Sequence, residues 1–258
     1  IDQDCDGGDD LTCSGSFTST DGLEYCATIS GTLTLDNTGY TNLDALHNLT
    51  YVSGRITINS NSVLTNIDGL SNLTTAGSVF KIIGNPVLAN LDGLSSLTSV
   101  GSILNISDNN ALQNLDGLSS VTTLATSLLI NNNPVLESVN GFVGVETAKR
   151  VTIWNNPAIA SIDGLANLTT LEQSLSISET ALTDLDALGN LTQVGSNVSI
   201  TMNDVLTNVD GLSSLTSVGD DFDISDNVSL CQESVDLIVA SCTIAGEVHT
   251  ENNTGTCP

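Results

Sequence analysis

Short segments along this chain alternate apolar and polar residues, and they return at nearly constant spacing. Examples are Ile56-Thr57-Ile58, Phe80-Lys81-Ile82 and Leu128-Leu129-Ile130. Alternation of this kind is typical of a β-strand with one buried face. An Asn follows most of these segments three residues later, at Asn61, Asn85, Asn109, Asn133, Asn156, Asn203 and Asn227. We expect a turn there, in which the Asn side chain bonds to backbone groups of the next coil.

A tetrapeptide of the form apolar-Asp-Gly-Leu lies between the strand segments. Its copies begin at Leu43, Ile67, Leu91, Leu115, Val139, Ile162, Leu185 and Val209, so they are 23 or 24 residues apart. A fixed period in this range identifies a leucine-rich-repeat array. The repeat predicts an all-β fold, a right-handed parallel β-solenoid of about nine coils. Each Asp is expected to cap amides of its own turn, with a row of bound cations as the alternative.

The two ends of the chain depart from the repeat. We expect an acidic N-terminal segment at residues 1–12, the solenoid at 13–230 and a C-terminal cap at 231–258. Cys231 to Cys242 is the one stretch with a sustained helical period, and it predicts a short capping helix. The chain begins at Ile1 without a Met or a signal sequence, which we interpret as a processed or truncated product. No apolar run approaches the length of a membrane span, so we expect no membrane insertion.

The cysteines lie only near the two ends of the chain. They are Cys5, Cys13, Cys26, Cys231, Cys242 and Cys257. This placement predicts disulfides that staple the caps of the solenoid, and hence an oxidising compartment. The chain has no Cys-x-x-Cys pair, which disfavours a zinc site. Three cysteines at each end leave one unpaired thiol at each end. These two thiols stay free, pair with each other if the N-terminal tail folds back along the rod, or form a disulfide between one molecule and the next.

Both ends resemble receptor L-domains, the ligand-binding solenoids of epidermal-growth-factor and insulin receptors. Residues 26–35 look like the first strand of those domains, and residues 227–240 look like their closing turn and capping helix. The resemblance implies a Cys13–Cys26 disulfide and pairing of Cys231 with Cys242 or Cys257. The repeats also resemble repetitive surface proteins of marine bacteria and fungal cell-wall proteins of the same superfamily. These resemblances imply a secreted or cell-surface location.

The net charge of −26, from 30 acidic and 4 basic residues, restricts the possible partners. Nucleic acid and anionic membranes are excluded, because binding them needs clustered Lys or Arg. A solvated acidic surface or Ca²⁺ binding explains the acidity. Residues 2–10 carry an Asp-x-Asp-x-Asp-Gly pattern similar to calcium loops, although the closing Glu is missing. The predicted Ca²⁺ ligands are Asp2, Asp4, Asp6 and Asp10.

Three further features are candidate sites. Lys149, Arg150 and Trp154 combine two cations with the only Trp, at an outward strand position, and predict a binding contact. A row of Thr residues, including Thr74, Thr98 and Thr122, resembles ice-binding surfaces, although plain Thr pairing also explains it. Sequons that glycosylation would use lie at Asn48, Asn72, Asn105, Asn167, Asn190, Asn197, Asn227 and Asn252.

The sequence offers little for catalysis. It contains no phosphate loop, nucleophile elbow or metalloprotease motif, and His47 and His249 lie near opposite ends of the chain. We therefore expect a non-catalytic binding or adhesion protein whose partner is a protein or carbohydrate at a cell surface. The alternative is a structural subunit that assembles end to end with copies of itself, and the third possibility is ice binding.

Overall fold

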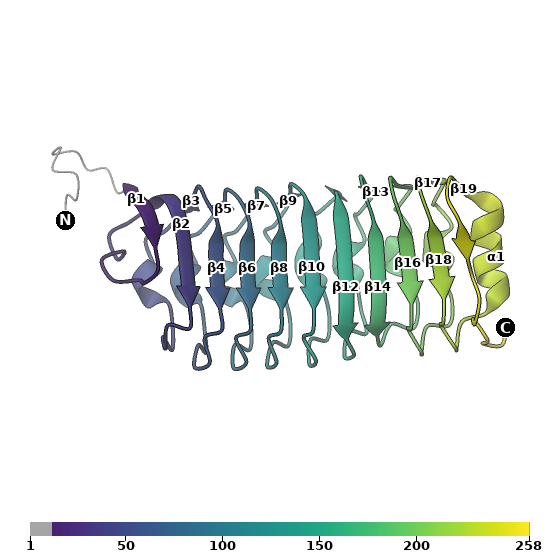
Figure 1. Cartoon of the computed structure of the whole chain (residues 1–258), viewed down its shortest axis with the longest axis horizontal. Helices are drawn as coiled ribbons and strands as arrows, with labels where there is room; N and C mark the ends of the chain where they lie inside the picture. The colour runs from purple at the N-terminus through teal and green to yellow at the C-terminus, as the bar shows by residue number, and fades with distance from the viewer. Residues whose placement is uncertain (1–11, 258) are drawn as a thin grey trace.

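The computed structural model describes residues 12–257 and shows a rod of stacked coils (Figure 1). Ten strands of a 15-stranded parallel sheet follow one another along one side of the rod, one from each coil. These strands are β2 (Thr28–Asp36), β4 (Ile56–Asn59), β6 (Phe80–Ile83), β8 (Leu104–Ser107), β10 (Ser127–Asn131), β12 (Arg150–Asn156), β14 (Leu175–Thr180), β16 (Val198–Thr201), β18 (Phe222–Ser225) and β20 (Val248–His249). At the N-terminal end, β1 (Thr12–Phe17) pairs with β2.

A second side of each coil is a two-residue strand. Four of them, β3 (Tyr51–Val52), β5 (Thr75–Ala76), β7 (Ser99–Val100) and β9 (Thr123–Leu124), join the large sheet through β2. The other five, β11 (Thr147–Ala148), β13 (Thr170–Leu171), β15 (Gln193–Val194), β17 (Ser217–Val218) and β19 (Thr243–Ile244), form a separate sheet. The sheet is interrupted between β9 and β11, in the coil that is one residue shorter than its predecessors.

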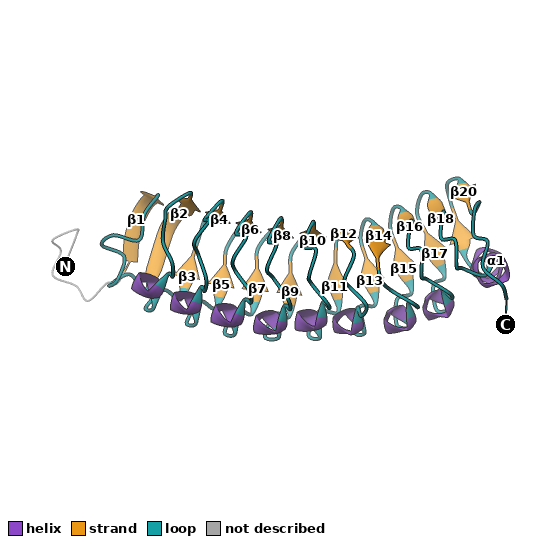
Figure 2. Cartoon of the chain, turned by 90° about the horizontal axis from the view of Figure 1, so that it is seen from below, coloured by secondary structure: helices purple, strands orange, loops and turns teal. Residues whose placement is uncertain are grey.

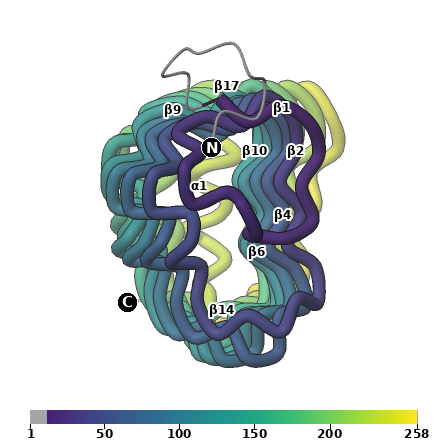
Figure 3. Tube along the Cα trace, turned by 90° about the vertical axis from the view of Figure 1, so that its left-hand side faces the viewer, coloured from purple at the N-terminus to yellow at the C-terminus, as the bar shows by residue number. Residues whose placement is uncertain are grey.

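The third side of each coil is a 3-10 helix at the repeated tetrapeptide. The helices are η1 (Asp44–Leu46), η2 (Asp68–Leu70), η3 (Asp92–Leu94), η4 (Asp116–Leu118), η5 (Asn140–Phe142), η6 (Asp163–Leu165), η7 (Asp186–Leu188) and η8 (Asp210–Leu212). Figure 2 shows these helices on the convex side of the rod and the large sheet on the concave side. Viewed along the axis, the coils overlie one another and α1 (Gln232–Ser241) lies across the far end (Figure 3). None of the described helices is long and apolar enough to cross a membrane.

Aliphatic side chains fill the interior of the tube. Leu, Ile and Val at the inward strand and helix positions are almost completely buried. Phe80, Phe142 and Phe222 are the fully buried rings among the described residues, and Phe17 and Tyr40 pack against the core from its edge. Stacked coils let each inward residue contact the equivalent residue above and below it, as the repeat pattern predicts. Val235 and Ile238 of α1 are buried as well, so the helix closes the end of this core.

A buried ladder of Asn side chains holds successive coils together. The Oδ1 of Asn85 accepts hydrogen bonds from the backbone N–H of Asn61 (3.2 Å) and from its Nδ2 (3.1 Å). The Nδ2 of Asn85 donates to the carbonyl of Ile58 at 3.1 Å. The predicted turn Asn therefore does bond to backbone of a neighbouring coil, but to the preceding coil rather than the next one. Where Thr180 replaces the Asn, its hydroxyl donates to Oδ1 of Asn203 at 2.7 Å.

The Asp of the tetrapeptide does not cap its own turn, so that prediction is wrong. The Asn two residues earlier does so, as when Oδ1 of Asn66 accepts the backbone N–H of Asp68 at 3.2 Å. The Asp begins the 3-10 helix and is exposed. At Asp210 its Oδ1 accepts a hydrogen bond from the Ser234 hydroxyl at 3.2 Å. The Asx turn is formed by the less regular residue two positions before the Asp, so the regular recurrence of the Asp did not indicate the capping residue.

Two disulfides staple the ends of the described solenoid. Cys13 pairs with Cys26, with the Cα atoms 5.7 Å apart, and Cys231 pairs with Cys257, with the Cα atoms 4.9 Å apart. Of the two partners that the sequence predicts for Cys231, Cys257 is the one that pairs. Cys242 is therefore the leftover thiol and is free rather than part of a disulfide. The reason is geometric: Cys231 and Cys242 are the N-cap and C-cap of α1. A helix of that length separates them by about 16 Å, well beyond the roughly 7 Å limit for a disulfide.

Candidate functional site: the concave face of the large sheet

The outward side chains of the large sheet form rows along the rod, because parallel strands in register place equivalent residues side by side. One row runs through Thr57, Lys81, Asn105, Leu129 and Thr152. The next runs through Asn59, Ile83, Ser107, Asn131 and Trp154. The residues just before the inward strand positions form a third row of Arg55, Val79, Ile103, Ser127 and Arg150. Neighbours within a row are about 4.8 Å apart.

Basic residues concentrate on this concave face. Arg55, Lys81 and Arg150 occupy outward positions of β4, β6 and β12 or the residue that leads into them, and Lys149 directly precedes Arg150. These are all the Lys and Arg residues of a chain that has 30 acidic ones. No Asp or Glu stands in the three rows from β4 to β16. The middle of the concave face is therefore positive or neutral on an otherwise strongly acidic molecule.

Apolar side chains share the same area. The central concave patch, as we define it, consists of Arg55, Val79, Lys81, Ile83, Ile103, Leu129, Arg150 and Trp154. Its aliphatic members are half-buried and occupy outward positions in or just before the strands, where other coils carry polar residues such as Ser and Asn. Outward apolar side chains beside cations on an open sheet are typical of a contact surface.

Trp154 is the largest exposed side chain of the patch, at 43% of its full exposure. It stands between Asn131 of β10 and Ser178 of β14. Its indole Nε1 donates a hydrogen bond to Oε1 of Glu179 at 2.9 Å. Glu179 has a positive φ of 55° at the end of β14, so the turn directs its carboxylate toward the indole. The ring is thus held in place with much of its surface open to solvent.

Among the predicted contact residues, Arg150 and Trp154 lie on the same face of β12, whereas Lys149 is displaced from it. Lys149 lies at the corner between the two sheets, and its Nζ is 3.6 Å from Oε2 of Glu172 on the next coil. Both side chains are largely exposed, so this ion pair contributes about 0–1 kcal/mol. Arg55, Lys81 and Arg150 have no ion pair or side-chain hydrogen bond within the described residues.

Two buried side-chain oxygens in the described chain lack a hydrogen-bond partner, and both belong to the coil before β12. They are Thr126 Oγ1 and Asn131 Oδ1. Asn131 is the register partner of Trp154, and the carbonyl of Thr126 accepts the backbone N–H groups of Lys149 and Arg150. The least satisfied part of the described solenoid therefore adjoins the patch.

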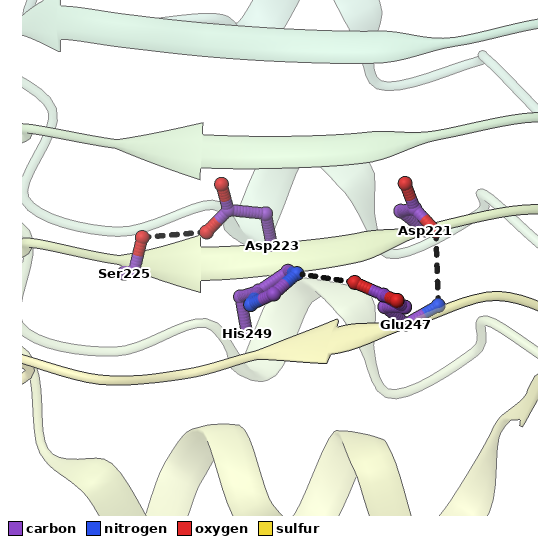
Figure 4. A network of polar contacts seen from close by, with 5 residues as sticks. All are labelled: Asp221, Asp223, Ser225, Glu247 and His249. Atoms are coloured by element: carbon purple, nitrogen blue, oxygen red, sulfur yellow. Dashed lines mark hydrogen bonds and ion pairs between the residues drawn. The ribbon is translucent and has the colours of Figure 1, made fainter.

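The concave face changes sign at its C-terminal end. Asp221, Asp223 and Glu247 gather there beside His249 (Figure 4). His249 Nε2 lies 3.4 Å from Oε2 of Glu247, and the backbone N–H of Glu247 donates to Oδ1 of Asp221 at 2.9 Å. The face thus has a cationic and apolar middle and an acidic end.

The predicted calcium ligands Asp2, Asp4, Asp6 and Asp10, together with Cys5, lie outside the described residues.

The predicted Thr row is present, but its hydroxyls donate to backbone carbonyls of the preceding coil, as Thr98 Oγ1 does to the carbonyl of Thr74 at 3.0 Å. This bonding gives the row a structural role in joining coils.

The sequons divide by exposure. Asn48, Asn72, Asn167 and Asn190 are exposed, and each Nδ2 donates to a carbonyl of the preceding coil. Asn252 is exposed, and Asn105 and Asn197 are half-buried near the concave face. The prediction for Asn227 is wrong for the folded chain, because this residue is fully buried in the Asn ladder and its Nδ2 donates to Ile200 at 2.8 Å.

Sequence reasoning missed Arg55, Lys81 and the aliphatic part of the patch. Their outward orientation was readable from the strand alternation, but their proximity to Trp154 depends on parallel register across five coils. The signal that was available is the scarcity of basic residues. All four fall between residues 55 and 150, in or beside strand segments.

The short period, the parallel strands, the 3-10 helices and the Asn ladder together define a leucine-rich-repeat solenoid. No protein-family model matches the chain, and no curated protein matches it. Among solved structures, it is similar to an internalin C2 of Listeria monocytogenes, with 21% identity over 77% of this chain and 80% of that chain and a TM-score of 0.47. An internalin F of the same organism has 16% identity over 94% and 84%, with a TM-score of 0.46. A leucine-rich-repeat protein of Leptospira interrogans has 13% identity over 86% and 90%, with a TM-score of 0.22.

Proposed function

We propose that the protein is a non-catalytic, extracellular or cell-surface binding protein that holds a protein partner against its central concave patch. The observation that carries this proposal is the distribution of charge. A chain with a net charge of −26 places all its cations on or beside one face and has no Asp or Glu in the three outward rows in the middle of that face, where the adjoining carboxylate of Glu179 accepts the indole N–H of Trp154. A solvated acidic surface alone does not require such segregation.

The composition of the patch supports protein binding. Trp and Arg are the residues most enriched among the energetically dominant contacts of protein interfaces. Here Arg150 and Trp154 stand on one strand, with Leu129 on the neighbouring strand. The curvature of the rod also places the patch in the hollow of the molecule, where a convex partner would contact several strands at once (Figure 2). Two disulfides support an oxidising, extracellular compartment.

A comparison of three immobilised proteins tests this function. The wild type, the Arg150→Glu/Trp154→Ala variant and the control variant Val143→Glu are exposed to native extracellular material. Val143 directly follows η5 on the convex side and is 46% exposed, so its substitution leaves the patch intact. We expect a partner that the wild type and the control retain and the double variant loses. Equal retention by the double variant, with an unchanged circular dichroism spectrum, would contradict the proposal.

A further inference from the structure

The row that begins at Arg55 has a pattern of its own. Along the rod it reads Arg55, Val79, Ile103, Ser127 and Arg150. The backbone N–H of Ile56 donates to the carbonyl of Val79 and that of Phe80 donates to Ile103, which fixes the register of the row. The row continues through the direct pairing of Ser127 with Arg150. Two arginines therefore flank two aliphatic side chains and a Ser in single file.

The spacing of the arginines follows from the strand ladder. Arg55 and Arg150 are four strand steps apart, which corresponds to about 19 Å at 4.8 Å per step. Both arginines are exposed, while Val79 and Ile103 between them are half-buried. Neither arginine has an ionic partner within the described residues, so both guanidinium groups offer their N–H donors to an external carboxylate.

Building on the proposed function, we infer that the partner presents an extended acidic segment that lies along this row. The segment carries carboxylates at positions i and i+6 and apolar side chains at i+2 and i+4. In an extended chain these residues share one face, and the first and last are about 20 Å apart. The carboxylates pair with Arg55 and Arg150. The apolar side chain at i+2, about 7 Å along the row, covers Val79 and Ile103, and the one at i+4, about 13 Å along, lies between Ile103 and Ser127.

A helical segment fits this row less well. An axial distance of 19 Å corresponds to about thirteen residues of helix. At 3.6 residues per turn, the residue thirteen positions later faces about 220° away from the first, so its carboxylate points away from the sheet. The nearest residues that face the same way as the first, i+11 and i+14, lie about 16 Å and about 21 Å along the axis and so miss the 19 Å spacing by more than the extended chain does. The extended form reproduces the spacing and the direction together more closely, within about 1 Å of the 19 Å span.

Synthetic peptides test the inference on the full-length chain. One peptide carries Asp at i and i+6 with Leu at i+2 and i+4, and its isomer has the same composition with both Asp residues adjacent. Fluorescence anisotropy should show at least tenfold tighter binding of the spaced peptide. Arg150→Gln and Arg55→Gln should each weaken that binding about tenfold. Lys149→Gln is the matched control and should leave it within twofold, because Lys149 lies at the corner beside Glu172 rather than in the row.

Several results would overturn the inference. Equal affinity for the two isomers, binding insensitive to Arg55→Gln and Arg150→Gln, or no binding of either peptide at millimolar concentration would each do so. The proposed function is judged separately by capture of a native partner. If the Arg150→Glu/Trp154→Ala variant loses the native partner while the peptides show no spacing preference, the proposed binding face is supported and only the inference of an extended acidic segment is rejected.

Discussion

Single side chains decide how one coil holds the next. The Asn ladder satisfies buried backbone groups that the strands and the 3-10 helices leave open, and it does so in coil after coil. The sequence predicts that a turn with such a side chain follows each strand, because the spacing from the strand is constant. The direction of the bonds could not be predicted, because either neighbouring coil offers suitable backbone groups and only the three-dimensional register selects the preceding one.

Replacement of Asn133 by Ala tests the ladder in the middle of the rod. The change leaves the backbone N–H of Asn109 without its acceptor and the carbonyl of Ile106 without its donor. Since an unpaired buried group costs about 1–3 kcal/mol, we expect a loss of about 2–4 kcal/mol in the free energy of unfolding. Urea titration measures this loss. Asn110→Ala is the control, because Asn110 is exposed, and an equally large effect there would contradict the account.

The free thiol of Cys242 gives a prediction about pH. Burial raises the pKa of this thiol above its ordinary value, and a hydrogen bond involving the backbone of Val218 offsets only part of the rise. The thiolate is the reactive form, so a higher pKa leaves less of it at neutral pH. Alkylation by iodoacetamide should therefore be slower than that of a free model thiol at pH 7 and should still be rising above pH 9. A rate that levels off below pH 8 would show a lowered pKa instead.

At the scale of elements, close approach between 3-10 helices explains the Gly of the tetrapeptide. A Cβ placed on Gly117 would lie 2.0 Å from the carbonyl oxygen of Leu91 in the preceding coil. The repeat shows that Gly recurs, but the reason lies between coils and cannot be predicted without the stacking distance. Ala187 stands at the same position in another coil, so the interface there accommodates a methyl group.

Substitution of Gly117 by Ala should therefore force neighbouring coils apart. We expect a loss of about 1–3 kcal/mol in unfolding free energy, the usual cost of overpacking. Gly189→Ala is the matched control, because a Cβ there meets only the carbonyl oxygen of Asp186, at 3.3 Å. Thermal unfolding of the two variants decides the matter. A Gly117→Ala protein as stable as the control would mean that the coils adjust without cost.

The N-terminal acidic segment carries an independent prediction. If Asp2, Asp4, Asp6 and Asp10 hold one Ca²⁺, alternating carboxylates converge on the ion and removal of one of them weakens the site. Calorimetric titration of the Asp4→Ala protein with Ca²⁺ should then show one site fewer than the parent protein. An identical titration of the two proteins would remove this site from the account.

At the scale of the whole molecule, the sequence predicts the solenoid, its parallel strands, its capping helix and its aliphatic core. These features follow from period and alternation, which are local properties of the chain. The central concave patch could be predicted only in part. Arg150 and Trp154 could be predicted because basic and aromatic residues are rare in this chain. That they share a surface with Arg55 and Lys81 could not, because Arg55 and Arg150 are 95 positions apart in the sequence and lie in one row only through the strand register. The end-to-end filament stays a prediction from the cysteines, and α1 already covers the terminal core that stacking would bury.

Photo-crosslinking from two positions tests the central claim most directly. A photoreactive amino acid replaces Leu129, in the middle of the central concave patch, or Val143, on the convex side, and each protein is irradiated with native extracellular material. We predict a discrete protein adduct from position 129 that Arg150→Glu abolishes, and no such adduct from position 143. An adduct from position 143 alone, or one from position 129 that Arg150→Glu leaves unchanged, would contradict binding through the patch.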